Sequence, residues 1–133
     1  MQIAEAKNNV PFVKNFYCCG YQEHKHEYMY DCIWLQWFLM YLTDDDLIAA
    51  LKQSAEHLTT HPQTGHSGLI FVKENVKSRD YIVDKEDNSV IRSVIYFNKI
   101  FEAAGLEIIH SSYQPGWPKD LYEIVLWVLR KKK

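Results

Sequence analysis

The sequence predicts an α/β protein built on one mixed β-sheet, and three observations support this prediction. Through the middle of the chain, apolar runs of strand length alternate with segments of helical periodicity. Two apolar runs near the end, 106–111 and 121–129, are joined without a helix, so we expect an antiparallel pair. At 133 residues, with 47% hydrophobic and 24% charged side chains, the chain has the size and composition of one folded domain, residues 1–133. Such alternation usually places helices on both faces of a sheet, in three layers.

The amino-terminal third is predicted to contain the end of one helix and two strands. Residues 3–8 have a helical pattern that stops at two asparagines. Residues 12–19 alternate weakly between apolar and polar and end at a glycine, which predicts a short strand. Residues 28–38 are almost continuously apolar and rich in aromatic side chains, as in a strand buried on both faces.

Two helices are predicted in the rest of the chain. Thr43 precedes three aspartates, which is a capping sequence, and helical periodicity then continues to about Thr59. A short strand at 68–73 and a polar loop at 74–86 follow. The second helix is predicted to be capped by Asp87 or Asn88 and to stop at a glycine. Its apolar positions at helical spacing are Val90, Val94, Phe97, Phe101 and Ala104.

Polar and aromatic side chains follow each of the first three predicted strands. Ligands of open α/β sheets bind beyond the carboxyl ends of the strands, so these side chains meet at one rim if the strands are parallel. Amide and aromatic groups in such a place suit a nucleoside, although polar residues also begin wherever a strand simply ends. The groups are Gly20, Tyr21 and Gln22 after the first strand, Gln36 and Trp37 after the second, and Glu74 and Asn75 after the third.

A second cluster of polar residues is acidic. Asp80, Asp84, Glu86 and Asp87 lie close together in the sequence, next to Ser89. Carboxylates beside aromatic side chains can bind a cation. Taken alone, the cluster is explained more simply by one helix cap and a solvated loop.

The composition argues against several classes of protein. The net charge of −2 gives no basis for binding nucleic acid or an anionic membrane, and no apolar run is long enough to span a bilayer. The three cysteines, two of them adjacent, do not form a disulfide framework, and the six histidines lack a recognised metal-ligand spacing. We therefore predict no metal site, no membrane and no nucleic-acid partner.

Six segments together resemble the α-N-terminal protein methyltransferases, enzymes that act on proteins beginning Xaa-Pro-Lys. The segments are NFYCCGYQEH (15–24), YDCIWLQWFLMYLTDDDL (30–47), GLIFVKENV (68–76), DKEDNSVIRS (84–93), AAGLEI (103–108) and P-x-D-L-Y (118–122). The resemblance implies a Rossmann-like sheet of the S-adenosylmethionine-dependent methyltransferase type, matching its carboxy-terminal two-thirds. The first two strands and the glycine-rich cofactor loop are expected to be absent.

The resemblance also implies a place for the cofactor, S-adenosyl-L-methionine. Gly20, Tyr21 and Gln22 would lie at its adenosine, and Gln36 near its methionine part. These are the same side chains that the strand ends bring to the predicted rim.

The resemblance further implies a groove for the substrate peptide. Trp37 would pack against the substrate proline, and Asn75 would hold the first peptide carbonyl. Leu121 and Tyr122 would help to wall the groove.

The acidic cluster then becomes the charged end of the substrate site. Asp84 and Ser89 would receive the substrate lysine, and Asp87 would sit at the α-amine as a base. Tyr41 stands where the family has a histidine near the amine, and a phenol is a weaker base than an imidazole at neutral pH, so Asp87 would act with less help. Glu74 replaces the usual aspartate before the asparagine, which keeps the charge on a longer side chain.

The missing strands have a consequence for the sheet, because they would lie between the predicted strands 12–19 and 28–38. Without them, strand 28–38 has one bare apolar edge, which is a site for pairing with another chain. Three outcomes stay open: the two strands pair directly, another chain supplies the edge in a homo- or hetero-oligomer, or the chain is a fragment of a longer product.

The sequence thus predicts a methyltransferase of the nucleus and cytoplasm that acts on the α-amine of Xaa-Pro-Lys proteins. The alternative is a catalytically inactive, truncated paralogue that binds or regulates a full-length homologue. A methyltransferase of small molecules is a third hypothesis, and it would leave the acidic cluster without a role.

Overall fold

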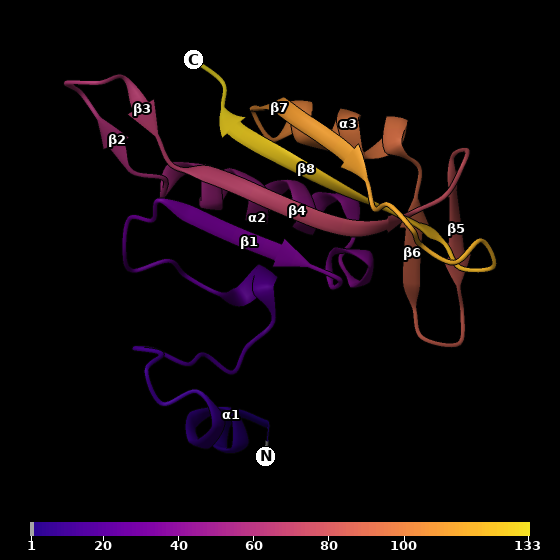
Figure 1. Cartoon of the computed structure of the whole chain (residues 1–133), viewed down its shortest axis with the longest axis horizontal. Coiled ribbons are helices and arrows are strands. Elements are labelled where there is room, and N and C mark those ends of the chain that lie inside the picture. Colours follow the sequence, from indigo (N-terminus) through magenta and orange to yellow (C-terminus); the bar gives the residue numbers. More distant parts are fainter. Residues whose placement is uncertain (1) are drawn as a thin grey trace.

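A four-stranded mixed sheet organises the structure, a computed structural model that describes residues 2–133. Its strands are β1 (Cys32–Gln36), β4 (Leu69–Val76), β7 (Leu106–Tyr113) and β8 (Glu123–Lys131), in the order β1-β4-β8-β7. β1 runs parallel to β4, whereas β8 is antiparallel to both of its neighbours (Figure 1). The predicted α/β class and the antiparallel pair at the carboxyl end are confirmed.

Two helices pack on one face of this sheet, α2 (Asp44–Glu56) and α3 (Val94–Ala103). α2 begins as predicted, since the Thr43 hydroxyl accepts a hydrogen bond from the N–H of Asp46 over 3.2 Å. α3 ends as predicted at Gly105, whose φ of 75° is a conformation that glycine adopts readily.

The start of α3 was predicted too early. Ser93, not Asp87 or Asn88, caps the helix by accepting from the N–H of Tyr96 over 3.2 Å. The preceding residues form a hairpin of β5 (Tyr81–Asp84) and β6 (Ser89–Arg92). In a segment of four residues, the spacing of apolar side chains does not distinguish a strand from one turn of helix. Here the chain reverses direction at Asn88, whose φ is 58°, and the segment forms a hairpin.

The same hairpin overturns the predicted loop at 74–86. β4 extends to Val76, and β5 follows within that range. The polar composition reflects exposure, because all four residues of β5 face solvent. A second, smaller hairpin joins β2 (Thr60–His61) to β3 (His66–Ser67).

Residues 12–19 do not form the predicted strand. The region consists of turns, bends and backbone without regular secondary structure between α1 (Gln2–Asn9) and the 3-10 turn η1 (Tyr21–Glu23). A strand needs a hydrogen-bonding neighbour, and this segment pairs neither with β1 nor with any other described strand.

The predicted strand 28–38 is confirmed only over Cys32–Gln36, and it is not buried on both faces. Ile33 and Leu35 are buried, whereas Trp34 is 52% exposed. β1 is therefore an edge strand with one open face, and it leads into a second 3-10 turn, η2 (Leu39–Tyr41).

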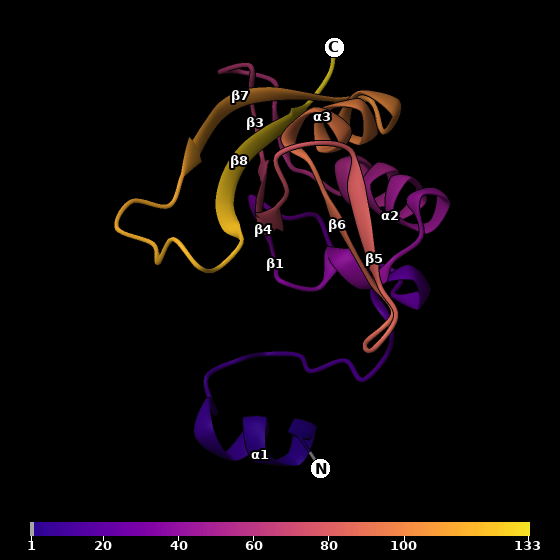
Figure 2. The ribbon, with the colours of Figure 1, turned by 90° about the vertical axis from the view of Figure 1, so that its right-hand side faces the viewer.

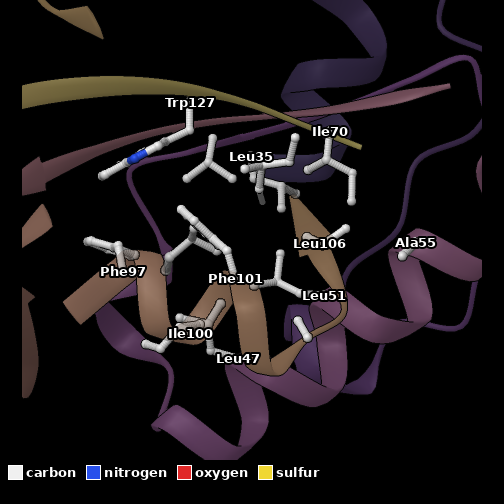
Figure 3. Close-up of a cluster of buried hydrophobic side chains, with 14 of the residues drawn as sticks. Leu35, Leu47, Leu51, Ala55, Ile70, Phe97, Ile100, Phe101, Leu106 and Trp127 are labelled. Atoms are coloured by element: carbon white, nitrogen blue, oxygen red, sulfur yellow. The ribbon is translucent and has the colours of Figure 1, made fainter. Parts of the chain in front are cut away.

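The core lies between the sheet and the two helices (Figure 3). Trp127 of β8 packs against Phe97 and Phe101 of α3, with ring centroids 5.0 and 5.4 Å apart. Leu47 and Leu51 of α2 complete this cluster, and all five side chains are fully buried. The predicted apolar faces of both helices are thus the faces that drive the packing.

The expectation of helices on both faces is wrong for the described residues, which form two layers. Figure 2 shows α2 and α3 on one side of the sheet and no helix against the other side. α1 lies apart from the sheet and buries none of its side chains. None of the helices within residues 2–133 combines the length and apolarity needed to cross a membrane.

Candidate functional site

The carboxyl ends of β1 and β4 lie at the same end of the sheet, as the sequence predicted for a parallel pair. Gln36 is in register with Lys73, so the next residues of both strands, Trp37 and Glu74-Asn75, follow at this rim. The N–H of Trp37 donates to the carbonyl of Lys73 over 3.1 Å. The β5–β6 hairpin continues from the same end of β4 (Figure 1). Two of the three predicted sets of rim residues are therefore confirmed as neighbours.

Trp37 leaves the sheet in an unusual conformation. Its φ of 55° is rare for a non-glycine residue and turns the chain away from β1. The indole is 44% exposed, and the ammonium of Lys73 lies 5.9 Å from the ring centroid. A strained backbone that presents a large aromatic side chain is typical of a ligand-binding position.

A cavity of about 580 Å³ lies between residues 17–24 and the turn at η2. It is lined by Gly20, Tyr21 and Gln22 together with Tyr41. Gln36 does not line this cavity; its side-chain oxygen accepts a hydrogen bond from the Trp34 indole over 2.9 Å. The cavity is also lined by residues that the sequence reasoning missed: Tyr17, Cys19, His24, Phe38 and Leu42.

Tyr21 fixes the wall of this cavity to α2. Its hydroxyl hydrogen-bonds the Ser54 hydroxyl, and its ring packs edge-on against Phe38 with centroids 5.1 Å apart. Burial raises the pKa of Tyr21, with the hydrogen bond from Ser54 acting in the opposite direction. The segment that was predicted as a strand is thus held by side chains rather than by a backbone ladder.

Histidine side chains hold the next part of the same segment. His26 hydrogen-bonds Ser54 through Nε2 at 3.2 Å, while its Nδ1 is buried without a partner in the described part of the chain. Burial lowers the pKa of His26, and the neighbouring His24 and His57 lower it further. Within residues 2–133 no three His, Cys, Asp or Glu side chains are placed to hold a metal ion.

Glu74 supports the rim from inside the protein, where it is only 1% exposed. Its two oxygens accept the N–H groups of Leu39, at 3.1 Å, and Asn75, at 2.9 Å. Burial raises the pKa of Glu74 to about 7, although these amides and Arg92 favour the charged form. Glu74 was predicted only as a strand-end group, whereas in β4 it lies on the inward side of the strand together with Val72 and Val76.

Arg92 joins this support to the two helices. The guanidinium, 1% exposed, donates to Asp44 at 2.9 Å and to the carbonyls of Leu39 and Leu42. Tyr96 of α3 also donates to Asp44. This network holds the η2 turn, and therefore Tyr41, between β4, α2 and β6. Arg92 was not predicted from the sequence, because the spacing of residues does not distinguish a buried arginine from an exposed one.

Asp84, Glu86 and Asp87 lie at the tip of the β5–β6 hairpin, not at a helix cap, whereas Asp80 precedes β5. Asp84 accepts the N–H of Glu86 over 2.9 Å, and Asp87 accepts the N–H of Ser89 over 3.0 Å. Asp84 and Ser89 face each other across the hairpin. The carboxylates are exposed, whereas Ser89 is 2% exposed. The structure thus groups Asp84, Asp87 and Ser89 in one turn, which shares no lining residue with the cavity at Tyr21.

Leu121 and Tyr122 lie in the loop between β7 and β8, and both are about half exposed, at 52% and 47%. Leu121 lines a separate cavity of about 410 Å³ with Trp117 and Ile124. Tyr122 does not line it. The two residues are therefore available to a ligand at the surface, and within residues 2–133 neither forms a hydrogen bond with the acidic hairpin tip.

Comparison with known proteins assigns the chain to a family. Residues 1–130 match the family model described as AdoMet dependent proline di-methyltransferase. The chain belongs to this family. It is 38% identical over 120 residues to α N-terminal protein methyltransferase 1 of Dictyostelium discoideum, covering 90% of this chain and 42% of that protein. It is 36% identical over 119 residues to N-terminal Xaa-Pro-Lys N-methyltransferase 1 of Danio rerio, covering 89% and 51%.

Solved structures place the fold in the same class. A S-adenosylmethionine-dependent methyltransferase from Leishmania major matches with a TM-score of 0.86 and 33% identity, over 96% of this chain and 50% of that one. A methyltransferase from Clostridium acetobutylicum, at 13% identity, matches with a TM-score of 0.72 over 98% and 71%. The predicted methyltransferase fold and the family resemblance are confirmed.

This member of the AdoMet-dependent family spans about half the length of the curated relatives it matches. That share is smaller than the two-thirds implied by the sequence resemblance. The described residues therefore match part of the fold found in these relatives.

Proposed function

We propose that this chain serves in the methylation of the α-amine of proteins that begin Xaa-Pro-Lys, with S-adenosylmethionine as the methyl donor. The observation that carries the proposal is the arrangement around the carboxyl ends of β1 and β4, where the indole of Trp37 projects. From these two ends the chain continues into η2, which lines the aromatic cavity, and into the acidic β5–β6 hairpin. The relative from Danio rerio bears the Xaa-Pro-Lys specificity in its name. Each of the three features matches one part of such a reaction.

The cavity at Tyr21 suits the adenosine part of the cofactor. Aromatic walls from Tyr21, Phe38 and Tyr41 allow stacking, and the Gln22 amide offers both a donor and an acceptor. A bound sulfonium cofactor supplies an electrophilic methyl group. Gln36, at the end of β1, is assigned to its methionine part, and its amide is already held by Trp34.

The rim then positions the substrate peptide. Trp37 offers an exposed aromatic face for the proline ring, and Asn75 offers an amide for the first peptide carbonyl. Leu121 and Tyr122 supply an apolar wall from the loop between β7 and β8. Methyl transfer to nitrogen is an in-line displacement, so such positioning supplies most of the catalysis.

The hairpin tip supplies charge and a base. Asp84 and Ser89 are assigned to the substrate lysine, whose ammonium needs an anionic partner. Asp87 is assigned to the α-amine, whose unperturbed pKa of roughly 7.7 to 8.0 means that only one readily lost proton must leave. The exposed Tyr41 can accept or donate a hydrogen bond near the same amine.

A transfer assay on the 133-residue chain tests the proposal. A Ser-Pro-Lys peptide, with S-adenosylmethionine, is expected to gain the mass of one or more methyl groups, and an acetylated peptide is expected to gain none. Asp87→Asn is expected to slow transfer by at least about a hundredfold, the usual contribution of a general base. Asp45→Asn, an exposed aspartate in the first turn of α2, serves as the matched control and is expected to leave the rate unchanged. Absence of product from the unmodified chain, or equal rates for the two variants, would refute the proposal.

A second candidate is a non-catalytic binding partner of a longer homologue, and the open edge of β1 favours it. Thermal melting separates the two. S-adenosylmethionine raises the melting temperature of a chain that binds it, whereas a chain that only binds a homologue shows no shift with the cofactor.

A further inference from the structure

A buried arginine joins three parts of the molecule that carry the candidate site. Arg92 is the last residue of β6 and is 1% exposed. Its backbone carbonyl accepts the N–H of Lys77, just after β4, over 3.1 Å. Its guanidinium reaches the η2 turn, where it donates to the carbonyl of Leu39 at 3.3 Å and to that of Leu42 at 2.7 Å. One residue therefore ties the β5–β6 hairpin to both β4 and η2.

Glu74 holds the same turn from β4. One of its oxygens accepts the N–H of Leu39 at 3.1 Å, and the other accepts the N–H of Asn75 at 2.9 Å. Leu39 is thus bonded through its N–H to β4 and through its C=O to Arg92 of β6. Because the carboxylate also bonds to Asn75, it links η2 directly to the residue assigned to the first peptide carbonyl of the substrate.

Asp44 and Tyr96 complete this network at the helices. Burying a guanidinium is costly unless its donors are bonded, and here Nε and Nη2 face Asp44 at 2.9 and 2.8 Å. Tyr96 of α3 donates to the other oxygen of Asp44. The Asp44 side chain is 42% exposed, so it is the accessible end of a network whose centre is buried. A buried polar network that is satisfied in this way holds one arrangement of the surrounding backbone.

The η2 turn needs such support because it is short. It spans only Leu39–Tyr41, and the hydrogen bonds of a 3-10 helix have poorer geometry than those of an α-helix. Leu39 and Met40 are buried and anchor one side of the turn. Trp37 and Tyr41, which the proposed function assigns to the substrate, are instead 44% and 55% exposed. Their positions therefore depend on how the backbone of the turn is held.

We propose that Arg92 and Glu74 form a clamp on η2 that positions the substrate-binding side chains. Tyr41 and Trp37 are set in this way against Asn75 and the acidic hairpin tip. Both members of the clamp are positioning residues, since they act through the backbone of η2. When the clamp is weakened, η2 and Asn75 lose their fixed spacing, and a peptide that contacts both binds less well. This effect on the substrate rests on the proposed function, whereas the clamp itself does not.

Hydrogen–deuterium exchange of the 133-residue chain tests the clamp without a substrate. Asp44→Asn weakens the anchor of Arg92 and is expected to speed exchange in residues 37–43 at least about fivefold, as for a weakened hydrogen bond to a charged group. Exchange in β8 is expected to stay unchanged. Asp45→Asn is the matched control, because it removes the same charge from the same turn of α2 and Asp45 forms none of these bonds. It is expected to change neither segment.

Glu74→Gln tests the clamp from β4. Only one side-chain oxygen remains, so the N–H of Leu39 or of Asn75 loses its acceptor. Exchange in residues 37–43 or 75–77 is expected to rise at least about tenfold. Leu51→Ala, in the fully buried core, is the control for a general loss of stability and is expected to speed exchange in β8 as well.

The KM for a Ser-Pro-Lys peptide separates positioning from stability. A less stable enzyme leaves less folded protein, which lowers the apparent kcat and leaves KM unchanged. A displaced η2 is expected to raise the peptide KM at least about fivefold in Asp44→Asn and in Glu74→Gln, because the peptide then meets a misplaced contact. Asp45→Asn is expected to keep the KM of the unmodified chain.

Three outcomes would contradict these expectations. Equal exchange in residues 37–43 for Asp44→Asn and Asp45→Asn overturns the clamp, and so does an increase that spreads equally through β8. An unchanged peptide KM in both clamp variants overturns its role in substrate binding. If the unmodified chain transfers no methyl group, the proposed function fails, and the exchange results still decide whether the clamp exists.

Discussion

Replacing Glu74 with glutamine is expected to change how the stability of the protein depends on pH. Burial raises the pKa of Glu74 from 4.5 to about 7 in the folded chain. Between these two values the folded state binds a proton that the unfolded state has lost, so the free energy of unfolding falls as pH rises. A difference of this size corresponds to about 3 kcal/mol lost between pH 4 and pH 8, at 1.36 kcal/mol per pKa unit. Glu74→Gln removes this contribution.

Urea unfolding at a series of pH values measures the effect. The two oxygens of Glu74 accept the N–H groups of Leu39 and Asn75. A glutamine has only one side-chain oxygen, so one of these N–H groups loses its acceptor and the variant is expected to be less stable at pH 5. Its stability should nevertheless fall less between pH 5 and pH 8 than that of the unmodified chain. Glu123→Gln, an exposed glutamate at the start of β8, is the matched control and should retain the original slope. Parallel pH profiles for Glu74→Gln and the unmodified chain would refute the argument from burial.

Two further changes have expected outcomes with different causes. His26 has a lowered pKa in the folded state, so the stability it contributes is present above pH 6.5 and is lost as pH falls below that value. His26→Gln should therefore reduce the fall in melting temperature as pH decreases below 6.5, whereas His110→Gln, at an exposed position, should not. The same fall in melting temperature for both variants would contradict this prediction. Leu51→Ala, in the fully buried core, is expected to cost about 2–5 kcal/mol in denaturant unfolding, against less than about 0.5 kcal/mol for Ile95→Ala, which is 69% exposed. Similar losses for these two would show that the core is not where the structure places it.

The prediction from sequence was most accurate at helix ends that are specified by a few neighbouring residues. Thr43 and the aspartates after it predicted the start of α2, and Gly105 predicted the end of α3. In both cases the information lies within one turn of the chain. The prediction was wrong at 12–19 and at 87–90. A weakly alternating segment becomes a strand only if a neighbour offers hydrogen bonds, and short apolar spacing near a turn fits a hairpin as well as a helix.

The candidate site was also predicted correctly in part. Parallel strands bring their carboxyl ends together, so the meeting of Trp37 and Asn75 at one rim followed from the sequence. The separation of the cavity at Tyr21 from the acidic hairpin tip did not, because it depends on how the β5–β6 hairpin leaves β4. Gln36 was assigned to the cofactor, yet in the structure its side-chain oxygen accepts a hydrogen bond from the indole of Trp34, two residues earlier in the same strand.

The sequence by itself determined the family, the order of the main strands and the apolar faces of both helices, because motif spacing and periodicity are properties of the chain alone. Tertiary structure decided which polar groups are enclosed. Glu74 and Arg92 look like ordinary surface residues in the sequence, and only packing between β4, α2 and α3 removes them from water and gives Glu74 its raised pKa. Tertiary structure also decided which strands pair, and among the described strands β1 pairs with β4 alone, because the neighbours in a sheet come from segments far apart in the sequence.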